Sequence, residues 1–307
     1  MIETALDRIV RKFWENAATL APPERRRAIQ RHARGREDTR KLRRSDFAIV
    51  SFGKSGRTWI NVMLSRYFQL RFKLPEFTLF SFDNYHDRNR AIPKILFTHD
   101  NYIQDYTGCG ARKTAFYAKP TLLLVRHPAD VAVSQFFQWR HRMRPHKKTM
   151  NGYPEAEDLP VYDFVMHDAG IRRVVAFLND WAREIPNIDN LLITRYETLR
   201  ADTRAELRRI LEWLGQTPTE AEIDQAIAFA SFENLKRMEA EKAFAVGKRM
   251  SAGDTKNPDS FKVRRAKVGG YRDYFSDEQV REIDAYIAEN LDPIFGYAAA
   301  ATPATAN

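Results

Sequence analysis

The sequence predicts an α/β domain with a central parallel sheet flanked by helices, in three layers. Short apolar, β-branched runs alternate with longer segments of helical spacing. The 307 residues, 44% of them hydrophobic, suffice for one large core of roughly 250–300 residues. The first apolar run ends in the turn Gly53-Lys54-Ser55-Gly56, and helical spacing follows it. This strand, loop and helix are typical of a P-loop-like fold that binds a phosphate or sulfate oxyanion.

The secondary structure was assigned from periodicity and from the polar or proline residues that end each run. Strands are expected at residues 47–52, 94–98, 121–125 and 190–194, with a strand or loop at 77–82. Helices are expected at residues 1–20, over the spaced apolar residues from 59 to 70, from 129 onward, and at 161–184, 203–214, 219–230 and 277–290. Strands separated by helices pair in parallel, so their carboxyl ends meet at one edge of the sheet.

Three parts of the chain are expected: an N-terminal helix and basic segment (1–44), the main domain (45–295) and a disordered tail (296–307). Residues 24–44 hold ten basic and three acidic side chains, and so carry most of the formal net charge of +10. Such a run is typical of a solvated helix face or a mobile arm. The alternative is a site for a polyanion or a membrane surface.

The remaining composition favours a soluble, cytoplasmic protein. Cys109 is the only cysteine, so no disulfide forms within the chain. No run of 18 or more apolar residues is present, which excludes a transmembrane helix. Acidic residues at positions 3, 7 and 15 interrupt the N-terminal apolar pattern, which excludes a signal peptide. The segment 245–271 lacks periodicity and suggests a binding loop or lid.

Polar side chains follow the expected strands, where ligands of parallel sheets bind. Lys54, His99, Arg126 and Tyr196 come after successive strands, and Ser134 lies about two helical turns beyond Arg126. Each has an ordinary alternative, such as a surface lysine or a structural histidine. Together they predict a phosphate-binding site with one possible general base.

Three motifs give the chain a resemblance to the sulfotransferases, which transfer a sulfuryl group from 3′-phosphoadenosine-5′-phosphosulfate to a hydroxyl or amine. Residues 53–59 (GKSGRTW) resemble the family's PKSGTTW loop, and residues 125–134 (VRHPADVAVS) resemble its second signature. Residues 261–275 (FKVRRAKVGGYRDYF) resemble the C-terminal signature RKGxxGDWKxxF. The motifs occur in the family's order over roughly residues 45–290.

The resemblance implies a role for each matching residue and no metal. Lys54 and His99 would be catalytic, with His99 as the general base. The donor would be bound through its 5′-phosphosulfate, its adenine and its 3′-phosphate by Ser55, Gly56, Arg57, Thr58, Trp59, Arg126, Ser134, Tyr196, Phe232, Arg264, Arg265 and the backbone at Ala266.

The chain departs from the family pattern at several positions. Gly53 replaces proline and Arg57 replaces threonine, which adds charge to the loop without removing its amide donors. Phe97 stands where many animal enzymes have a lysine, which leaves one fewer cation near the transferred group. In the C-terminal signature, Arg265-Ala266 replaces Lys-Gly and Gly270-Tyr271 replaces Asp-Trp, so the lid geometry is expected to differ.

Two other classes of function were considered. A P-loop kinase or NTPase would need glycine at position 48, where the chain has Ala48. A non-catalytic polyanion-binding protein would use residues 24–44 and bind in a salt-sensitive way. The acceptor and the oligomeric state are left open. The loops at 80–90, 102–117 and 140–153 offer aromatic and cationic side chains for an acceptor, either a small molecule or a saccharide, and a specific nucleic-acid partner is not expected.

Overall fold

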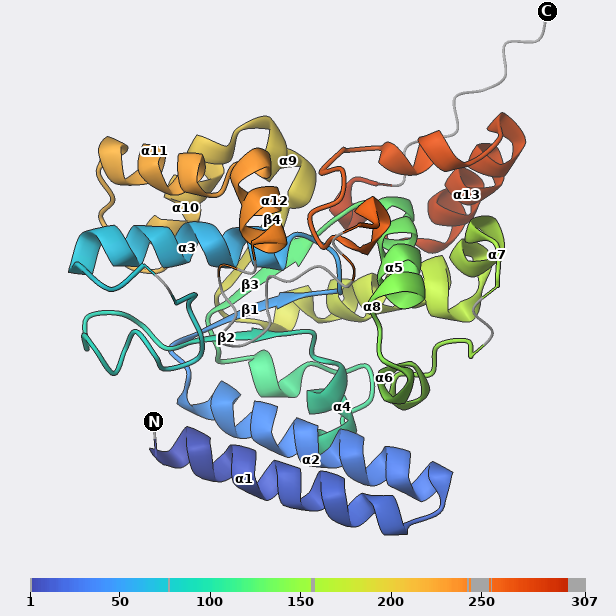
Figure 1. Ribbon diagram of the computed structural model, residues 1–307, viewed down its shortest axis with the longest axis horizontal. Helices are drawn as coiled ribbons and strands as arrows, with labels where there is room; N and C mark the ends of the chain where they lie inside the picture. Colours follow the sequence, from blue (N-terminus) through green and yellow to red (C-terminus); the bar gives the residue numbers. More distant parts are fainter. Residues whose placement is uncertain are drawn as a thin grey trace, which may run out of the picture.

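The computed structural model describes residues 2–76, 78–155, 158–241, 243, 254 and 256–297. Its centre is a parallel sheet in the order β2-β1-β3-β4, which confirms the predicted fold class. The strands are β1 (Phe47–Ser51), β2 (Ile95–Thr98), β3 (Thr121–Val125) and β4 (Leu191–Arg195). Each lies within one residue of its predicted range, and their carboxyl ends share one edge (Figure 1).

Alternating side chains of the strands pack into two separate apolar cores, one on each face of the sheet. In β1, Ile49 belongs to one core and Val50 to the other. In β3, Leu122 and Leu124 lie with Ile49, whereas Leu123 lies with Val50. Successive side chains of a strand point to opposite faces, so strands that are apolar at every position require helices on both sides.

Helices cover both faces and complete three layers (Figure 1). The core around Ile49 is closed by α3 (Arg57–Phe72), α10 (Thr203–Trp213), α11 (Glu220–Phe229) and α12 (Phe232–Ala240). The core around Val50 is closed by α5 (Pro128–His141), α7 (Val161–Met166), α8 (Arg173–Glu184) and α13 (Asp277–Asn290). The short helices are α6 (Pro145–Met150), α9 (Tyr196–Ala201) and the turns 114–116, 185–187, 258–260, 270–274 and 293–295.

The N-terminal segment forms two helices packed beyond the edge strand β2. They are α1 (Ile2–Ala17), followed by a turn at 18–20, and α2 (Pro23–Arg44). α2 packs closely on α4 (Asn101–Thr107), since a Cβ on Gly35 would lie 2.0 Å from the carbonyl oxygen of Tyr102. The expectation of a mobile arm is therefore wrong, because residues 24–44 lie in a fixed helix and Arg34, Arg40 and Arg44 form ion pairs with α1. The alternative of a solvated helix face holds in part, since residues 25–27 and 43 are exposed.

Other local predictions also changed. The helix expected at 161–184 is broken by a π-helical turn at Asp168–Arg172, inside which Gly170 has φ −93° and ψ −125°. A Cβ there would lie 2.2 Å from the carbonyl oxygen of Phe164, so only glycine allows this contact. Residues 78–82 are irregular, and Phe77 lies outside the described residues, as do 244–253, 255 and 298–307. Tyr297 is buried, so the folded body extends past the predicted boundary at 296.

Candidate active site

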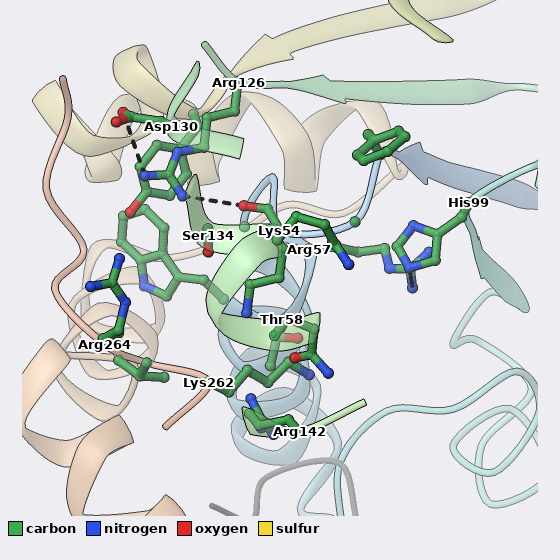
Figure 2. A pocket seen from close by; sticks show the side chains of 18 of the residues that line it. Lys54, Arg57, Thr58, His99, Arg126, Asp130, Ser134, Arg142, Lys262 and Arg264 are labelled. Atoms are coloured by element: carbon green, nitrogen blue, oxygen red, sulfur yellow. Dashed lines mark hydrogen bonds and ion pairs between the residues drawn. The ribbon is translucent and has the colours of Figure 1, made fainter. Parts of the chain in front are cut away.

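One cavity of about 1550 Å³ lies at the carboxyl ends of the strands. It is lined by every site residue that the sequence predicts except Ser55, which is buried beneath the loop. Figure 2 shows that Lys54, Arg126, Ser134 and Arg264 lie around the same space, with His99 at one side. Lys54 and Arg126, which are 72 positions apart, are thus brought together because β1 and β3 run parallel.

The phosphate loop follows β1 and needs left-handed backbone conformations at two positions. Lys54 has φ +74° and Gly56 has φ +101°. A Cβ on Gly56 would lie 2.7 Å from Cδ2 of Tyr196, so this position requires glycine for two reasons. Gly56 precedes α3, whose first turn contains no acidic side chain. The first amides of α3 and its macrodipole therefore favour an anion in front of the loop.

Lys54 lies in a cluster of cations. Burial lowers the pKa of Lys54 well below its usual value, and the charges of Arg142 and Lys262 lower it further. Arg142 pairs with the buried carboxylate of Glu239 at 3.7 Å. Figure 2 shows Lys54, Arg142 and Lys262 on one side of the pocket. This clustering of desolvated like charges is stabilised by a multiply charged anion.

His99 is held as a neutral hydrogen-bond acceptor. Its Nδ1 lies 2.7 Å from the carbonyl oxygen of Ser51, which can only accept a hydrogen bond, so Nδ1 carries the proton. Nε2 therefore has the lone pair, and Nη2 of Arg57 donates to it at 2.8 Å. Burial and then the charge of Arg57 lower the pKa of His99 to about 3. An imidazole of this kind can accept a proton only at Nε2.

Arg126 connects the phosphate loop to the C-terminal signature. Its Nη1 donates to the carbonyl oxygen of Lys54 at 3.2 Å, and its Nη2 donates to that of Lys267 at 3.1 Å. The guanidinium also stacks over the ring of Tyr196, 4.3 Å from the ring centroid. Together with an ion pair to Asp130 at 3.5 Å, these contacts hold Arg126 in the cavity wall, and a bidentate anion would replace some of them.

Asp130 fixes the C-terminal signature to α5. Its two carboxylate oxygens accept the backbone N–H groups of Gly269 and Tyr271, both at 2.9 Å. The Tyr271 ring stacks on His127, with centroids 5.0 Å apart and planes 9° from parallel. The altered lid residues therefore still form a defined structure. Ala266, where the family pattern has glycine, adopts φ +51°.

Arg264 and Arg265 reach the cavity from this segment. The guanidinium carbon of Arg264 lies 3.7 Å from the centroid of Phe137, and Arg264 donates to the hydroxyl of Tyr274. Arg265 donates to the same hydroxyl at 3.1 Å and pairs with Asp273 at 2.5 Å. Arg264 has a longer ion pair, 3.7 Å from Asp259, so its guanidinium is less firmly held by a carboxylate than that of Arg265.

An aromatic slot lies next to the loop. The indole Nε1 of Trp59 donates to the carbonyl oxygen of Ala230 at 3.0 Å, which fixes the ring. Tyr196 meets Trp59 edge-on at 6.0 Å, and Phe232 lines the same cavity from the start of α12. Ring faces that are fixed in this way suit a flat heteroaromatic ligand.

Sequence reasoning did not single out three residues of this site. Asp130 lies within the second motif, where its spacing from Arg126 was a usable signal. Lys262 lies in the third motif beside Arg264, and only its place near Lys54 distinguishes it. Glu239 accepts the backbone N–H groups of Lys262 and Val263 at 2.6 and 3.0 Å, and no sequence pattern marked it.

The fold and the cavity define an α/β protein with a cationic, partly aromatic cavity at the carboxyl end of a parallel sheet. Residues 44–295 match the family described as sulfotransferase domain, so the chain belongs to this family. The predicted family and enzyme class are thus confirmed. The chain is 24% identical over 280 residues to cytosolic sulfotransferase 17 of Arabidopsis thaliana, covering 82% of this chain and 75% of the relative. It is 25% identical over 271 residues to human sulfotransferase 6B1, covering 83% and 78%.

Solved structures show the same fold. Mouse sulfotransferase SULT7A1 complexed with PAP aligns with a TM-score of 0.53 at 19% identity, covering 83% of this chain and 86% of that one. Retinol dehydratase in a complex with retinol and PAP aligns with a TM-score of 0.51 at 19% identity, covering 80% and 81%. At this identity the likeness concerns the fold.

The described residues contain neither a membrane-spanning helix nor a group of metal ligands. No helix among them is long and apolar enough to cross a bilayer. In the same part of the chain, no three His, Cys, Asp or Glu side chains are grouped as metal ligands.

Proposed function

We propose that this protein transfers a sulfuryl group from 3′-phosphoadenosine-5′-phosphosulfate to an acceptor hydroxyl or amine, with His99 as the general base. The observation that carries the proposal is the meeting of the Lys54 loop, Arg126 and a neutral His99 in one cavity of a sulfotransferase-family protein. Two solved structures with the same fold are complexes with PAP, which supports the same donor.

The donor fits the cavity in three parts. The phosphosulfate binds to the α3 amides and Lys54. The 3′-phosphate binds to Arg126, Ser134 and Arg264, and adenine binds in the aromatic slot. Charge-assisted contacts to phosphate are among the strongest hydrogen bonds in proteins, and guanidinium groups match its geometry. The proposed donor site also includes Ser55, Thr58, Arg265 and the Ala266 backbone.

The reaction is an in-line transfer. The acceptor oxygen forms a bond to sulfur while the bond from sulfur to the phosphate oxygen breaks, and its electron pair goes to the leaving phosphate. The acceptor proton moves to Nε2 of His99. Lys54 and the loop amides stabilise the negative charge that develops on the phosphate. Arg57 must release Nε2 first, and the sulfuryl oxygens offer its guanidinium another partner.

The acceptor is proposed to be an anionic small molecule or saccharide. Arg27, Arg144 and Lys147 line the far end of the cavity and form no ion pair within the described part of the chain. Burial lowers the pKa of Lys147, and the charges of Arg34 and Arg144 lower it further. Asp105, which also lines the cavity, is already paired with Arg31 at 2.6 Å. The surplus positive charge favours an acceptor with a carboxylate, sulfate or phosphate group.

Thermal unfolding tests the donor site. Adenosine 3′,5′-bisphosphate, with EDTA present, should raise the melting temperature clearly more than ADP does. A ligand at about 100 times its Kd stabilises by about 2.7 kcal/mol. Arg126→Ala should reduce the difference between the two nucleotides, because adenosine 3′,5′-bisphosphate has its second phosphate at the 3′ position and ADP has it on the 5′-phosphate. A shift seen only with ATP and magnesium would instead support a kinase.

Transfer from labelled donor to pairs of acceptors tests the activity and the preference for an anionic acceptor. Each carboxylated phenol or sugar is compared with its neutral methyl ester. The acids should have the lower KM, and Arg144→Ser with Lys147→Ser should remove this preference without changing donor binding. Equal KM values for acid and ester would contradict an anionic acceptor, and no transfer to any acceptor would contradict the activity.

A further inference from the structure

The helix α1 is amphipathic with its polar face turned inward. Thr4, Asp7 and Ala18 are buried against α2, and Asp7 is only 3% exposed. On the opposite face, Leu6, Ile9 and Phe13 are 55%, 61% and 64% exposed. Among the described residues, the apolar core clusters contain no side chain of α1. This orientation is the reverse of a helix that packs by its apolar face.

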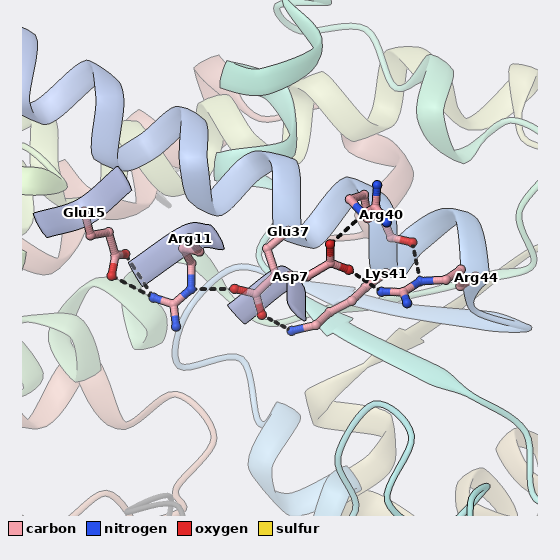
Figure 3. Close-up of polar contacts among 7 residues, drawn as sticks. All are labelled: Asp7, Arg11, Glu15, Glu37, Arg40, Lys41 and Arg44. Carbon is pink, nitrogen blue, oxygen red and sulfur yellow. Dashed lines mark hydrogen bonds and ion pairs between the residues drawn. The ribbon is translucent and has the colours of Figure 1, made fainter. Parts of the chain in front are cut away.

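Ion pairs, rather than apolar contacts, hold α1 on α2 (Figure 3). Asp7 binds Arg40 and Arg44, both at 2.6 Å, and Arg11 binds Glu37 at 2.5 Å. Glu15 pairs with Arg34 at 2.6 Å. The contacts repeat along the helix and fix its rotation, so the apolar face cannot turn inward without breaking several of them at once.

The outward face is a continuous apolar stripe. Leu6, Ile9 and Phe13 follow helical spacing, Trp14 is 49% exposed beside them, and Leu20 in the following turn is 92% exposed. Isolated exposed apolar residues are common, but a contiguous patch of this kind marks an interaction surface. We refer to these five residues as the α1 stripe.

Positive charge lies along one flank of the α1 stripe and beyond its C-terminal end. Arg8 and Lys12 are exposed along one flank of α1, and Arg25 and Arg26 are exposed at the start of α2, directly after Leu20. An aromatic and aliphatic face rimmed by Lys and Arg matches helices that lie in the interface of an anionic bilayer.

A second copy of the chain suits this face less well. At about 1.5 Å per residue, the 16 residues of α1 extend about 24 Å, and a face about 10 Å wide covers about 240 Å². A stable dimer buries about 800 Å² on each partner. Two copies would also bring their basic rims together. A bilayer needs no matching shape and supplies the opposite charge.

We propose that the α1 stripe is a docking surface for membranes that contain anionic lipids. The helix lies parallel to the bilayer, the stripe enters the boundary between headgroups and acyl chains, and the basic rim contacts the headgroups. The proposal rests on the N-terminal helices alone and does not depend on the sulfotransferase activity.

Co-sedimentation of the full chain with vesicles tests the proposal. Binding is expected with phosphatidylcholine mixed with phosphatidylserine, and weaker binding with phosphatidylcholine alone. Ile9→Ser combined with Phe13→Ser should weaken binding by about tenfold or more, since both side chains are mostly exposed and contribute little to folding. Ile294→Ser, at an apolar position that is 54% exposed in another part of the chain, is the matched control and should bind like the parent.

A second variant tests the charged rim. Arg8→Ser with Lys12→Ser should weaken binding to the mixed vesicles and reduce its salt dependence, while binding to phosphatidylcholine alone stays the same. The proposal is overturned if the parent does not sediment with mixed vesicles or if the Ile9 and Phe13 variant binds equally well. It is also overturned if ultracentrifugation shows a dimer that this variant abolishes while no vesicle binding is found, because a second copy would then cover the stripe.

Discussion

The guanidinium of Arg57 lies 2.8 Å from Nε2 of His99, the one ring nitrogen of that residue with a lone pair. The family pattern has threonine at position 57, so this contact is a feature of the present chain. It has two opposite effects on a general base. The positive charge adds to burial, the larger cause, in keeping His99 unprotonated in acidic solution, and the hydrogen bond occupies the atom that would accept the proton.

The first effect predicts a shifted pH profile. With Arg57 present, the pKa of His99 is lowered to about 3, so protonation of this residue should not limit kcat/KM near its ordinary value of about 6.5. In Arg57→Thr the acidic limb should move upward toward that value, although burial still lowers the pKa in part. The measurement is kcat/KM against pH for both proteins. Identical acidic limbs would show that Arg57 does not control the protonation of His99.

Removal of the imidazole should abolish turnover rather than donor binding. His99→Ala is expected to lower kcat by about 10²–10⁴-fold, the usual contribution of a general base. The stabilisation of the variant by adenosine 3′,5′-bisphosphate should stay close to that of the parent, because His99 lies to one side of the cationic cluster around Lys54 (Figure 2). His86→Ala, which changes a histidine outside the cavity, serves as the control. Full activity of His99→Ala would exclude His99 from the mechanism.

Lys54 should matter for the reaction and not for folding. Its pKa is lowered by burial and by neighbouring cations, so the charged form is disfavoured in the folded protein. Lys54→Met should therefore melt at or above the parent temperature without ligand, yet gain less from adenosine 3′,5′-bisphosphate and lose most of its rate. Calorimetry with and without the ligand gives both values. A variant that unfolds at a clearly lower temperature would make Lys54 structural.

Asp130 should control the C-terminal signature. Its carboxylate accepts two backbone N–H groups, and in Asp130→Asn one of them would face an amide NH₂ instead. We expect a loss of about 2 kcal/mol in the free energy of unfolding and weaker binding of the 3′-phosphate. Asp277→Asn, at an exposed position of α13, is the matched control. Urea unfolding that is equal for the two variants would contradict this role.

Asp38 gives a prediction about stability and pH. Burial, as the largest cause, raises its pKa to about 6 in the folded protein, whereas an unfolded aspartate has a pKa of about 3.9. Between these values the folded state binds more protons, so the contribution of Asp38 to stability falls as the pH rises through this window. Asp38→Asn should therefore be more stable than the parent at pH 7.5 and nearly equal at pH 4. A difference that is larger at pH 4 would have the wrong sign.

The structure agrees best with the sequence where local signals agree with each other. The strand at 121–125 and the helix at 277–290 have the predicted bounds, the latter because Ser276 and Gln279 form a capping box. The loop at 53–56 forms where its glycines and its flanking periodicity place it. The three motifs contain most of the predicted residues that line the cavity, whereas His99, Tyr196 and Phe232 lie outside them. These features depend on residues that are close in sequence.

Where the structure differs from the prediction made from the sequence, contacts between distant segments are the cause. Gly170 breaks a continuous helical pattern because the backbone at Phe164 approaches it closely, which no local propensity records. Glu239 is fully buried although it is a glutamate in an amphipathic helix, because it binds the backbone ahead of Arg264. Arg57 and His99 are 42 positions apart, and no sequence motif predicts their contact.

The sequence by itself determined the class of fold, the anion-binding loop and the family, because these follow from periodicity, glycine positions and short motifs. Only the tertiary structure decided which face of α1 is buried. Periodicity shows that the helix has an apolar and a polar face, and burial of the apolar one is the usual outcome. Here the acids at positions 7 and 15 meet arginines of α2, and these ion pairs turn the polar face inward and leave Ile9 and Phe13 exposed.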